Sequence, residues 1–471
     1  MKKTNQSSKA VSRRNFLKRA GVASGALLAL PTFIPARALG RDGNVPPSER
    51  IVLGAIGIGN RGSYVLGCFL EEPGVQFVAI CDVKEARRLA VKKRADDLYG
   101  NQDCAMYRDL NELLARPDID ATLIATGPNW HATAAILAAN AGKDVYCEKP
   151  FAETMADARH ALKVTKGSDR IIQIGSQRRS GAAYHAANEY LKSGEFGPIV
   201  AVEMSWNVNQ PGRWRRPALV AALKESETDW KRFLMNRPKA AWDPRKYLEY
   251  RLFWPYSSGI PGQWMCHQID TVHWFTGLPH PRSVSGNGGI YQWRDGRTNF
   301  DTLTAVFDYG PLDDLSRGFQ VTYSSRFTNS AGGIKEIYYS NGGELNLDTR
   351  KISSNGGLST KSAADMGLKA NLLAERSLEG EAAANAASMG VDRMTLAHMR
   401  NWLECVRSRN QTNAPVEAGY SHSIATIMAN AAVRTGKKVT FDAKRQEVMA
   451  GDKGFRSEEH TSELQSPYVI S

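Results

Sequence analysis

The sequence lacks the signatures of a disulfide-stapled or membrane-spanning protein. Its six cysteines form no C-x-x-C pair, and several lie within apolar stretches. A chain of 471 residues can bury an adequate core without cross-links, so we expect buried free thiols. No segment supplies the roughly 20 apolar residues that a membrane-spanning helix needs.

Basic clusters are also scarce outside the first residues. The net charge of +13 includes eight Lys or Arg residues and no acidic residue in residues 1–38, which leaves +5 for the rest. Because that remainder has no lysine- or arginine-rich block to follow a phosphate backbone, we expect no nucleic-acid partner.

The two ends of the chain carry patterns that do not belong to the fold. Ser12-Arg13-Arg14-Asn15-Phe16-Leu17-Lys18 precedes a moderately apolar stretch and the cleavage-type site Ala36-Arg37-Ala38. This pattern is typical of a signal for the twin-arginine export machinery, so we predict a signal peptide at 1–38 and a linker at 39–49. The protein is then expected to be periplasmic or otherwise exported, or membrane-anchored if the leader is not cleaved. Residues 456–471 resemble a translated sequencing adapter, and we treat them as an artefact.

A glycine turn follows the first apolar stretch, Ile51 to Ile56. In Gly57-Ile58-Gly59-Asn60-Arg61-Gly62, the first glycine permits a tight turn and the second lets a pyrophosphate approach the backbone. The third allows close packing of helix on strand, which leaves the anion at the helix N-terminus. The predicted cofactor contacts of this turn are Gly57, Gly59, Asn60, Arg61 and Gly62.

A second apolar stretch, Val75 to Cys81, ends at Asp82, which lies 20 positions beyond Gly62. A carboxylate at that point can accept hydrogen bonds from both ribose hydroxyls and would repel a 2′-phosphate. The sequence therefore favours NAD over NADP. The alternative to a dinucleotide site is an ordinary turn between a strand and a helix.

The chain alternates strands and helices from 50 to 174, which predicts a parallel Rossmann sheet covered on both faces. Further strands are expected at 120–126, 144–148 and 171–174, with helices at 109–115, 131–141 and 155–166. Ligands bind beyond the carboxyl ends of such strands, so 126–131 and 148–150 are placed at the site.

A second domain is predicted over 175–455, as an α+β domain with a largely antiparallel open sheet and helices on one face. The stretch 359–387 is rich in small and polar residues and suggests a mobile surface loop. The expected helices are 183–193, 394–407 and 421–436, and the expected strands are 199–208, 302–309, 320–327 and 336–340.

Five stretches together resemble the Gfo/Idh/MocA oxidoreductase family, and the likeness runs from about Arg50 to Asp442. They are Gly57-Ile58-Gly59-Asn60-Arg61-Gly62, Cys81-Asp82-Val83, Thr126-Gly127-Pro128-Asn129-Trp130-His131, Glu148-Lys149-Pro150 and Gly175-Ser176-Gln177-Arg178-Arg179. The resemblance implies an enzyme, an NAD(P)-dependent oxidoreductase of sugars, cyclitols and related polyols. It also implies a homo-oligomer that uses the open sheet.

The resemblance makes Lys149 the catalytic lysine, whose ammonium would stabilise a developing alkoxide. Glu148 would contact the nicotinamide ribose. The alternative for this pair is a surface ion pair at a strand end. Further cofactor contacts implied by the family are Thr126, Pro128, Asn129, His131, Glu148 and Gln177.

A helix within 258–274 matches the family segment that often carries an aspartate and a histidine. The histidine corresponds to His267, while Gln263 stands where the aspartate would be, so His267 would be the base, assisted by Asp270 one turn later. Gln263 can orient a hydroxyl but cannot take its proton. Zinc ligands at 267, 270 and 273 would not converge on one helix face, so no metal is predicted. The expected substrate contacts are Arg178, Arg251, Tyr256 and Gln263.

These observations predict an exported NAD-dependent oxidoreductase of a carbohydrate or polyol, with tightly bound cofactor because free NAD is scarce outside the cytoplasm. One alternative is a redox-neutral NAD-dependent glycosidase, since some family members cleave glycosides that way. Another is a noncatalytic sugar-binding protein, which the Gln263 departure favours.

Overall fold

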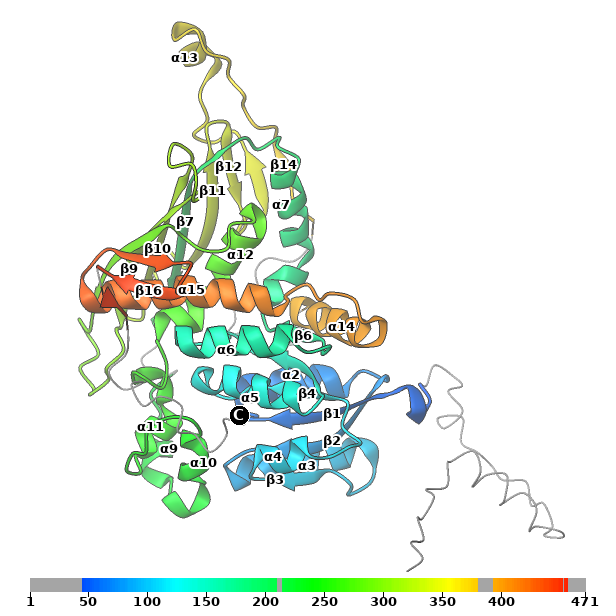
Figure 1. Cartoon of the computed structure of the whole chain (residues 1–471). Helices are drawn as coiled ribbons and strands as arrows, with labels where there is room; N and C mark the ends of the chain where they lie inside the picture. The colour runs from blue at the N-terminus through cyan, green and yellow to red at the C-terminus, as the bar shows by residue number, and fades with distance from the viewer. Residues whose placement is uncertain (1–44, 210–213, 380–392, 452, 456–471) are drawn as a thin grey trace, which may run out of the picture. The chain divides into compact units, whose positions relative to one another are not determined.

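The computed structural model describes residues 45–209, 214–379, 393–451 and 453–455 (Figure 1). The described residues fall into two units that divide after Arg50, and the first of them holds a 3-10 turn, Pro47–Glu49. The predicted signal peptide (1–38), residues 39–44 of the predicted linker and the predicted adapter-derived tail (456–471) lie outside the described residues. Within the described ranges, no helix is both long and apolar enough to cross a membrane.

The second unit begins with a parallel sheet, which in the described residues has six strands in the order β3-β2-β1-β4-β5-β6. Every neighbouring pair is parallel, as the Rossmann prediction required. Its strands are β1 (Ile51–Ile56), β2 (Val75–Cys81), β3 (Ala105–Tyr107), β4 (Ala121–Ile124), β5 (Asp144–Cys147) and β6 (Ile172–Ile174). The helices that follow them are α2 (Asn60–Leu70), α3 (Glu85–Tyr99), α4 (Leu110–Leu114), α5 (Pro128–Asn140) and α6 (Met155–Lys166).

Local sequence explains these elements. All four residues of β4 and of β5 are buried, as expected for strands covered on both faces. Helix α6 begins where the Thr154 side chain accepts a hydrogen bond from the Asp157 amide at 3.1 Å. The predicted range 155–166 is therefore confirmed.

A second sheet has eleven strands among the described residues, in the order β14-β13-β12-β11-β7-β10-β9-β8-β15-β16-β17. Only the pair β7 and β10 is parallel in this sheet, so the largely antiparallel prediction is confirmed. Buried and more exposed residues alternate along β9, so one face of that strand is covered. The strands are β7 (Ile199–Asn207), β8 (Ser283–Gly289), β9 (Thr302–Tyr309), β10 (Phe319–Arg326), β11 (Ile334–Ser340), β12 (Gly343–Asn346), β13 (Lys351–Ser353), β14 (Arg376–Ser377), β15 (Val439–Asp442), β16 (Glu447–Ala450) and β17 (Lys453–Gly454).

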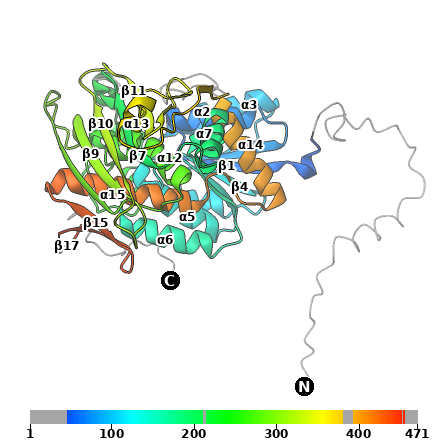
Figure 2. The same cartoon turned by 90° about the horizontal axis from the view of Figure 1, so that it is seen from above.

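Helix α15 lies against β8 of the second sheet and against α6 beside the parallel sheet, and Figure 2 shows it next to α6. The remaining described helices are α7 (Ala182–Lys192), α9 (Pro217–Ala222), α10 (Trp230–Leu234), α11 (Pro244–Leu248), α12 (Cys266–Thr276), α13 (Thr360–Asp365), α14 (Arg393–Ser408) and α15 (Val416–Thr435). Short helical turns are η3 (Gln177–Ser180), η4 (Glu225–Glu227), η5 (Tyr250–Leu252) and the π-helical η6 (Pro261–Met265).

The predicted loop 359–387 is wrong in part. The Ser359 side chain accepts a hydrogen bond from the Ser362 amide, and this cap starts α13 in a stretch that composition alone marked as irregular. Strand β14 also falls within the predicted loop, while residues 380–387 lie outside the described ranges.

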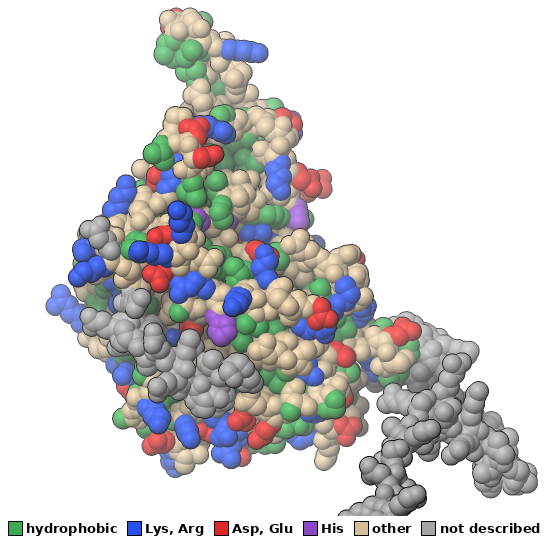
Figure 3. All heavy atoms as spheres, viewed as in Figure 1, with side chains coloured by type: hydrophobic (Ala, Val, Ile, Leu, Met, Phe, Trp, Pro, Cys, Tyr) green, Lys and Arg blue, Asp and Glu red, His purple; other side chains and the backbone are tan. Residues whose placement is uncertain are grey.

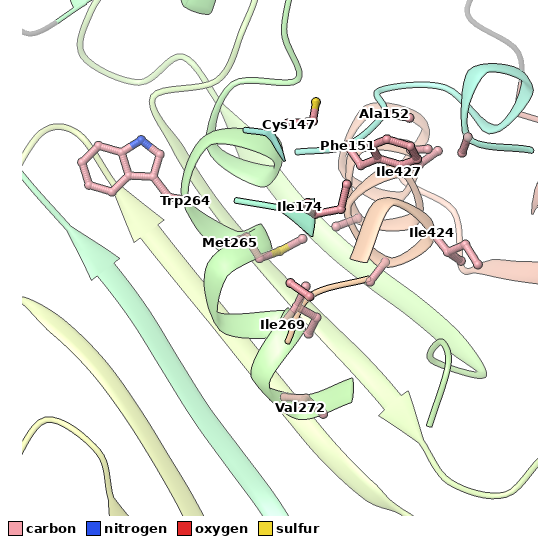
Figure 4. Close-up of a cluster of buried hydrophobic side chains, with 14 of the residues drawn as sticks. Cys147, Phe151, Ala152, Ile174, Trp264, Met265, Ile269, Val272, Ile424 and Ile427 are labelled. Carbon is pink, nitrogen blue, oxygen red and sulfur yellow. The ribbon is translucent and has the colours of Figure 1, made fainter. Parts of the chain in front are cut away.

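The parallel sheet and the later helices share one hydrophobic core (Figure 4). Ile269 of α12 and Ile424 of α15 belong to the same cluster as Cys147 of β5 and Ile174 of β6. The predicted division between residues 174 and 175 stays a prediction, since α14 and α15 return to the Rossmann half. All six cysteines are free and buried, as predicted.

The surface drawn in Figure 3 carries basic and acidic side chains side by side. On this face no broad region of one sign forms among the described residues.

Candidate functional site

The glycine turn between β1 and α2 has the geometry that its spacing predicts. Gly57 has φ +74°, and an added Cβ would lie 2.4 Å from Thr126 Cγ2, so this position admits only glycine. A Cβ at Gly62 would lie 3.0 Å from Ala125, which shows how closely α2 approaches the neighbouring strand end. The space beside Gly59 is open, since its nearest neighbours are Arg87 atoms at 4.0 Å. A pyrophosphate fits against this exposed backbone.

Asp82 directly follows β2. Its carboxylate is buried, and one of the two oxygens accepts no hydrogen bond within the described residues. Its Oδ1 accepts a hydrogen bond from the Lys84 amide at 2.8 Å, and Oδ2 has no hydrogen-bond partner in the described part of the chain. Arg87 Nη1 lies 3.8 Å from that oxygen. Burial raises the pKa of Asp82, and Arg87 opposes this effect. An unpaired buried acceptor is costly, so the site fits a ligand that donates hydroxyl hydrogen bonds, as a ribose does.

A cavity of about 540 Å³ joins this carboxylate to the glycine turn and to Lys149. Most of the predicted site residues line it, brought together because the carboxyl ends of parallel strands meet at one sheet edge. Those that line the cavity are Gly57, Gly59, Asn60, Arg61, Asp82, Thr126, Pro128, His131, Glu148, Lys149, Gln177, Arg178, Arg251, Gln263 and His267.

Glu148 is the centre of a polar cluster on the cavity wall. Its Oε1 accepts hydrogen bonds from Arg61 Nε at 3.2 Å and from Gln177 Nε2 at 2.9 Å. These residues come from α2, from the end of β5 and from η3, so the structure unites three separate predictions.

His131 joins two loops at the cavity edge. One ring nitrogen lies 2.8 Å from the Pro150 carbonyl and the other 3.1 Å from the Thr126 carbonyl. Burial lowers the pKa of His131. Its contacts hold the two loops together and leave no ring nitrogen for the cofactor.

Lys149 projects from the loop after β5 into the cavity. Its Nζ donates a hydrogen bond to the Gln263 carbonyl at 2.6 Å, and Arg251 Nε donates to the Gln263 side-chain oxygen at 2.8 Å. Burial lowers the pKa of Lys149, so its proton is more readily released than that of an exposed lysine.

His267 lines the cavity from the first turn of α12. Its ring stacks on Trp206, with centroids 5.8 Å apart, and its buried Nε2 has no hydrogen-bond partner in the described ranges. Burial first, and then the charges of Lys149 and Arg178, hold the pKa of His267 well below its usual range. The imidazole is therefore neutral at ordinary pH and has a ring nitrogen free for a ligand.

Asp270 does not reach the cavity, which corrects the prediction that it assists His267. Its carboxylate forms a two-fold ion pair with Arg179, at 2.7 and 3.1 Å, and lies 3.5 Å from His422 Nδ1. His422 Nε2 in turn accepts a hydrogen bond from the Phe151 amide at 3.2 Å. Asp270 thus orients the histidine of α15 that holds the loop after Lys149.

Other predicted residues have partners that restrict their roles. Arg178 lines the cavity, yet its guanidinium forms a buried ion pair with Glu336 of β11. Tyr256 packs in an aromatic cluster beside Trp130 and is not on the cavity wall. Asn129 also lies off the wall, because its side-chain amide donates to the Pro255 carbonyl. Gly62 acts through packing alone.

The cavity also contains residues that the sequence argument missed. Arg87 lies five positions beyond Asp82, and this proximity to the predicted ribose carboxylate was the available signal. Tyr247 lies in a stretch of the sequence that is rich in aromatic residues, and nothing in its spacing distinguished it from packing residues. Further wall residues of this kind are Arg87, Arg108, Trp214, Arg232, Phe233, Tyr247, Tyr250 and Trp264.

The strand, glycine turn and helix, together with the carboxylate at the end of β2, define a dinucleotide-binding Rossmann protein joined to an α+β domain. Residues 51–176 match the profile of the Gfo/Idh/MocA family, described as an oxidoreductase family with an NAD-binding Rossmann fold. This segment is similar to that family, as the sequence resemblance predicted, and the prediction of NAD as cofactor is confirmed.

Relatives with known names share part of the chain. An inositol 2-dehydrogenase of Salmonella paratyphi B is 29% identical over 210 residues, which is 44% of this chain and 59% of the relative. A glycosyl hydrolase family 109 protein of Shewanella baltica is 29% identical over 237 residues, 44% of this chain and 50% of the relative. The matched region thus spans only half to three fifths of these relatives.

The fold extends further than the sequence likeness. The crystal structure of myo-inositol 2-dehydrogenase from Lactobacillus plantarum superposes with a TM-score of 0.58 at 18% identity, covering 83% of this chain and all of that one. This match confirms the two-domain fold class.

Proposed function

We propose that this protein is an NAD-dependent oxidoreductase acting on a hydroxyl of a sugar, cyclitol or related polyol. The observation that carries the proposal is that Lys149 and His267 line the same cavity as the glycine turn and Asp82. The inositol dehydrogenase among the relatives supports the substrate class.

In the oxidation direction, the neutral His267 accepts the hydroxyl proton at Nε2. The Lys149 ammonium donates a hydrogen bond to the oxygen as negative charge develops on it. Bound NAD would supply the acceptor for the hydride and its two electrons, which leave the carbinol carbon as its C–H bond breaks and C=O forms. Arg251 and Gln263 hold each other on the wall and orient further substrate oxygens.

Replacement of the catalytic lysine tests this assignment. We expect Lys149→Met to reduce turnover by at least about 100-fold, because the developing alkoxide loses its cationic donor. NAD affinity, measured by calorimetry, should stay within a few-fold of wild type. The matched control is Lys163→Met, which removes an exposed lysine of α6. Near-normal turnover of the Lys149 variant would rule out its catalytic role.

A redox-neutral glycosidase is the second candidate, and the glycosyl hydrolase relative at equal identity favours it. A panel of sugars and glycosides distinguishes the two when reduced-nicotinamide absorbance and free-sugar release are followed in the same samples. Reduced cofactor without cleavage supports the oxidoreductase. Sugar release without net reduction assigns the glycosidase instead.

Export by the twin-arginine machinery and tight retention of the cofactor are further parts of the proposal. They are supported by Arg13-Arg14 with the apolar stretch that follows, and by the scarcity of free NAD outside the cytoplasm. Fractionation of producing cells, with NAD content measured in the exported fraction, tests both. Recovery from the cytoplasm alone would contradict export, and nucleotide-free protein would contradict retention.

A further inference from the structure

The helical segment of residues 214–256 lies beyond the carboxyl ends of the parallel strands. Figure 1 shows its helices α9, α10 and α11 at the end of the sheet toward which β1 points. The Asp229 amide donates to the Val83 carbonyl at 3.1 Å, one residue past Asp82. Lys84 and Thr228 form an isolated antiparallel bridge. The segment is therefore attached to the loop that carries the predicted ribose carboxylate.

Side-chain contacts attach the same segment at other points. Arg232 Nε lies 3.2 Å from Asp109 Oδ2. Arg237 donates to the Asn129 carbonyl at 2.7 Å and to Asp157 at 2.9 Å. These bonds hold α10 and its following turn against the loop after β3 and against the first turns of α5 and α6.

Tyr247 of α11 is the polar residue that this arrangement brings to the Asp82 end of the cavity. Its side chain lines the cavity and is 3% exposed, and its hydroxyl has no hydrogen-bond partner in the described part of the chain. Arg87 and Asp82 are the charges that act most strongly on it. Asp82 Oδ2 is likewise buried and accepts no hydrogen bond within the described residues, although Arg87 Nη1 lies 3.8 Å away as an ion-pair partner.

Two buried polar atoms that have no hydrogen-bond partner in the described residues thus come from distant parts of the chain to line one cavity, and the charge of Asp82 acts on Tyr247 there. Burying such an atom is unfavourable unless a ligand supplies a hydrogen bond. Because Asp82 is where the adenosine ribose of a dinucleotide binds, the ligand group at this end is the adenosine half.

We propose that Tyr247 binds the adenosine half of the dinucleotide through its hydroxyl, from the helical segment of residues 214–256. This inference rests on the proposed use of NAD. It gives the 214–256 segment a function in cofactor binding in addition to its packing.

The test is calorimetric titration of the full chain, first freed of retained nucleotide, with ADP-ribose and, separately, with nicotinamide mononucleotide. Loss of one neutral hydrogen bond in Tyr247→Phe should weaken ADP-ribose binding by about 2- to 10-fold and leave nicotinamide mononucleotide binding unchanged. The matched control is Tyr420→Phe, which removes another buried hydroxyl without a partner in the described residues, away from the cavity wall. Melting temperatures of both variants verify folding.

Equal ADP-ribose affinity in wild type and Tyr247→Phe would overturn the inference while leaving NAD binding intact. Equal weakening of both ligands would also overturn it, because Tyr247 would then not act at the adenosine half. Failure of the wild type to bind ADP-ribose or NAD would instead overturn the proposed function together with the inference.

Discussion

The residues behind Lys149 show how burial controls protonation at this site. Glu153, on the loop that follows Lys149, is buried and accepts a hydrogen bond from the Ser258 amide at 3.3 Å. Burial raises the pKa of Glu153 to about 7. Near neutral pH this carboxyl therefore changes charge within the fold, close to the lysine on which the proposed chemistry depends.

The titration of Glu153 can be detected by measuring the unfolding free energy as a function of pH. From pH 4.5 to pH 7 the folded state keeps a proton on Glu153 that the unfolded state has lost, so the group's contribution to the unfolding free energy falls as pH rises. Glu153→Gln removes that dependence. We expect the variant to gain about 3 kcal/mol relative to wild type between pH 4.5 and 7, and no more above that range.

Urea unfolding of both proteins across this pH range provides the comparison. Glu336, whose pKa burial also raises to about 7, is present in both proteins and cancels in the difference. A difference that stays constant with pH would show that folding does not raise the pKa of Glu153.

Among the elements, the π-helical turn η6 before α12 organises the reacting groups. The Cys266 amide bonds back to the Pro261 carbonyl, a wider turn than an α-helix makes, and such turns are frequent at functional sites. Within this turn, the Gln263 carbonyl accepts a hydrogen bond from Lys149, and the Gln263 side-chain oxygen accepts one from Arg251. The position of Lys149 thus depends on a turn more than 100 residues away.

The turn η6 has no room for a side chain at Gly262. A Cβ there would lie 2.5 Å from Ser258 Oγ and 2.6 Å from Glu153 Oε1, closer than side-chain carbons approach. Gly262→Ala should therefore lower the unfolding free energy by about 1–3 kcal/mol through overpacking and reduce turnover, with NAD affinity retained.

Denaturant unfolding and steady-state kinetics measure these effects. The control is Gly454→Ala at the edge strand β17, where the added Cβ would meet only Glu447 Oε2 at 3.3 Å. Wild-type turnover in Gly262→Ala would show that the turn does not position Lys149.

At the scale of the whole molecule, the Rossmann half is completed by a helix from much later in the chain. Trp402 of α14 is fully buried, with its ring edge-on to Phe69 of α2 and Tyr146 of β5 at 5.6 and 5.8 Å. Met399 and Leu403 belong to the same cluster. The two sheets are therefore expected to unfold together.

Trp402→Ala should lower the unfolding free energy of the entire chain by about 3–5 kcal/mol, as other large-to-small core changes do. We expect a single transition in which circular dichroism and loss of NAD binding coincide. The control is Leu315→Ala, a residue that is 80% exposed. Two separate transitions would show that the halves are independent.

The sequence alone determined the local elements and the edge at which the site forms. Apolar runs that end at Gly57 and Asp82 defined β1 and β2, and alternation along 302–309 defined β9. The site residues on the turn, on Asp82 and on Glu148-Lys149 follow from strand order, because parallel strands place their carboxyl ends together. Such patterns are readable since they depend on neighbours within one element.

Only the tertiary structure decided which partners the buried polar groups have. Asp270 pairs with Arg179, 91 residues away in the sequence, and therefore does not assist His267 as predicted. Arg178 pairs with Glu336, 158 residues away, and this pair holds Arg178 at the cavity wall. The same holds for Tyr247, which sequence could not separate from its aromatic neighbours. A buried polar group takes whatever partner packing brings to it, and that partner is set by how helices and sheets meet rather than by local spacing.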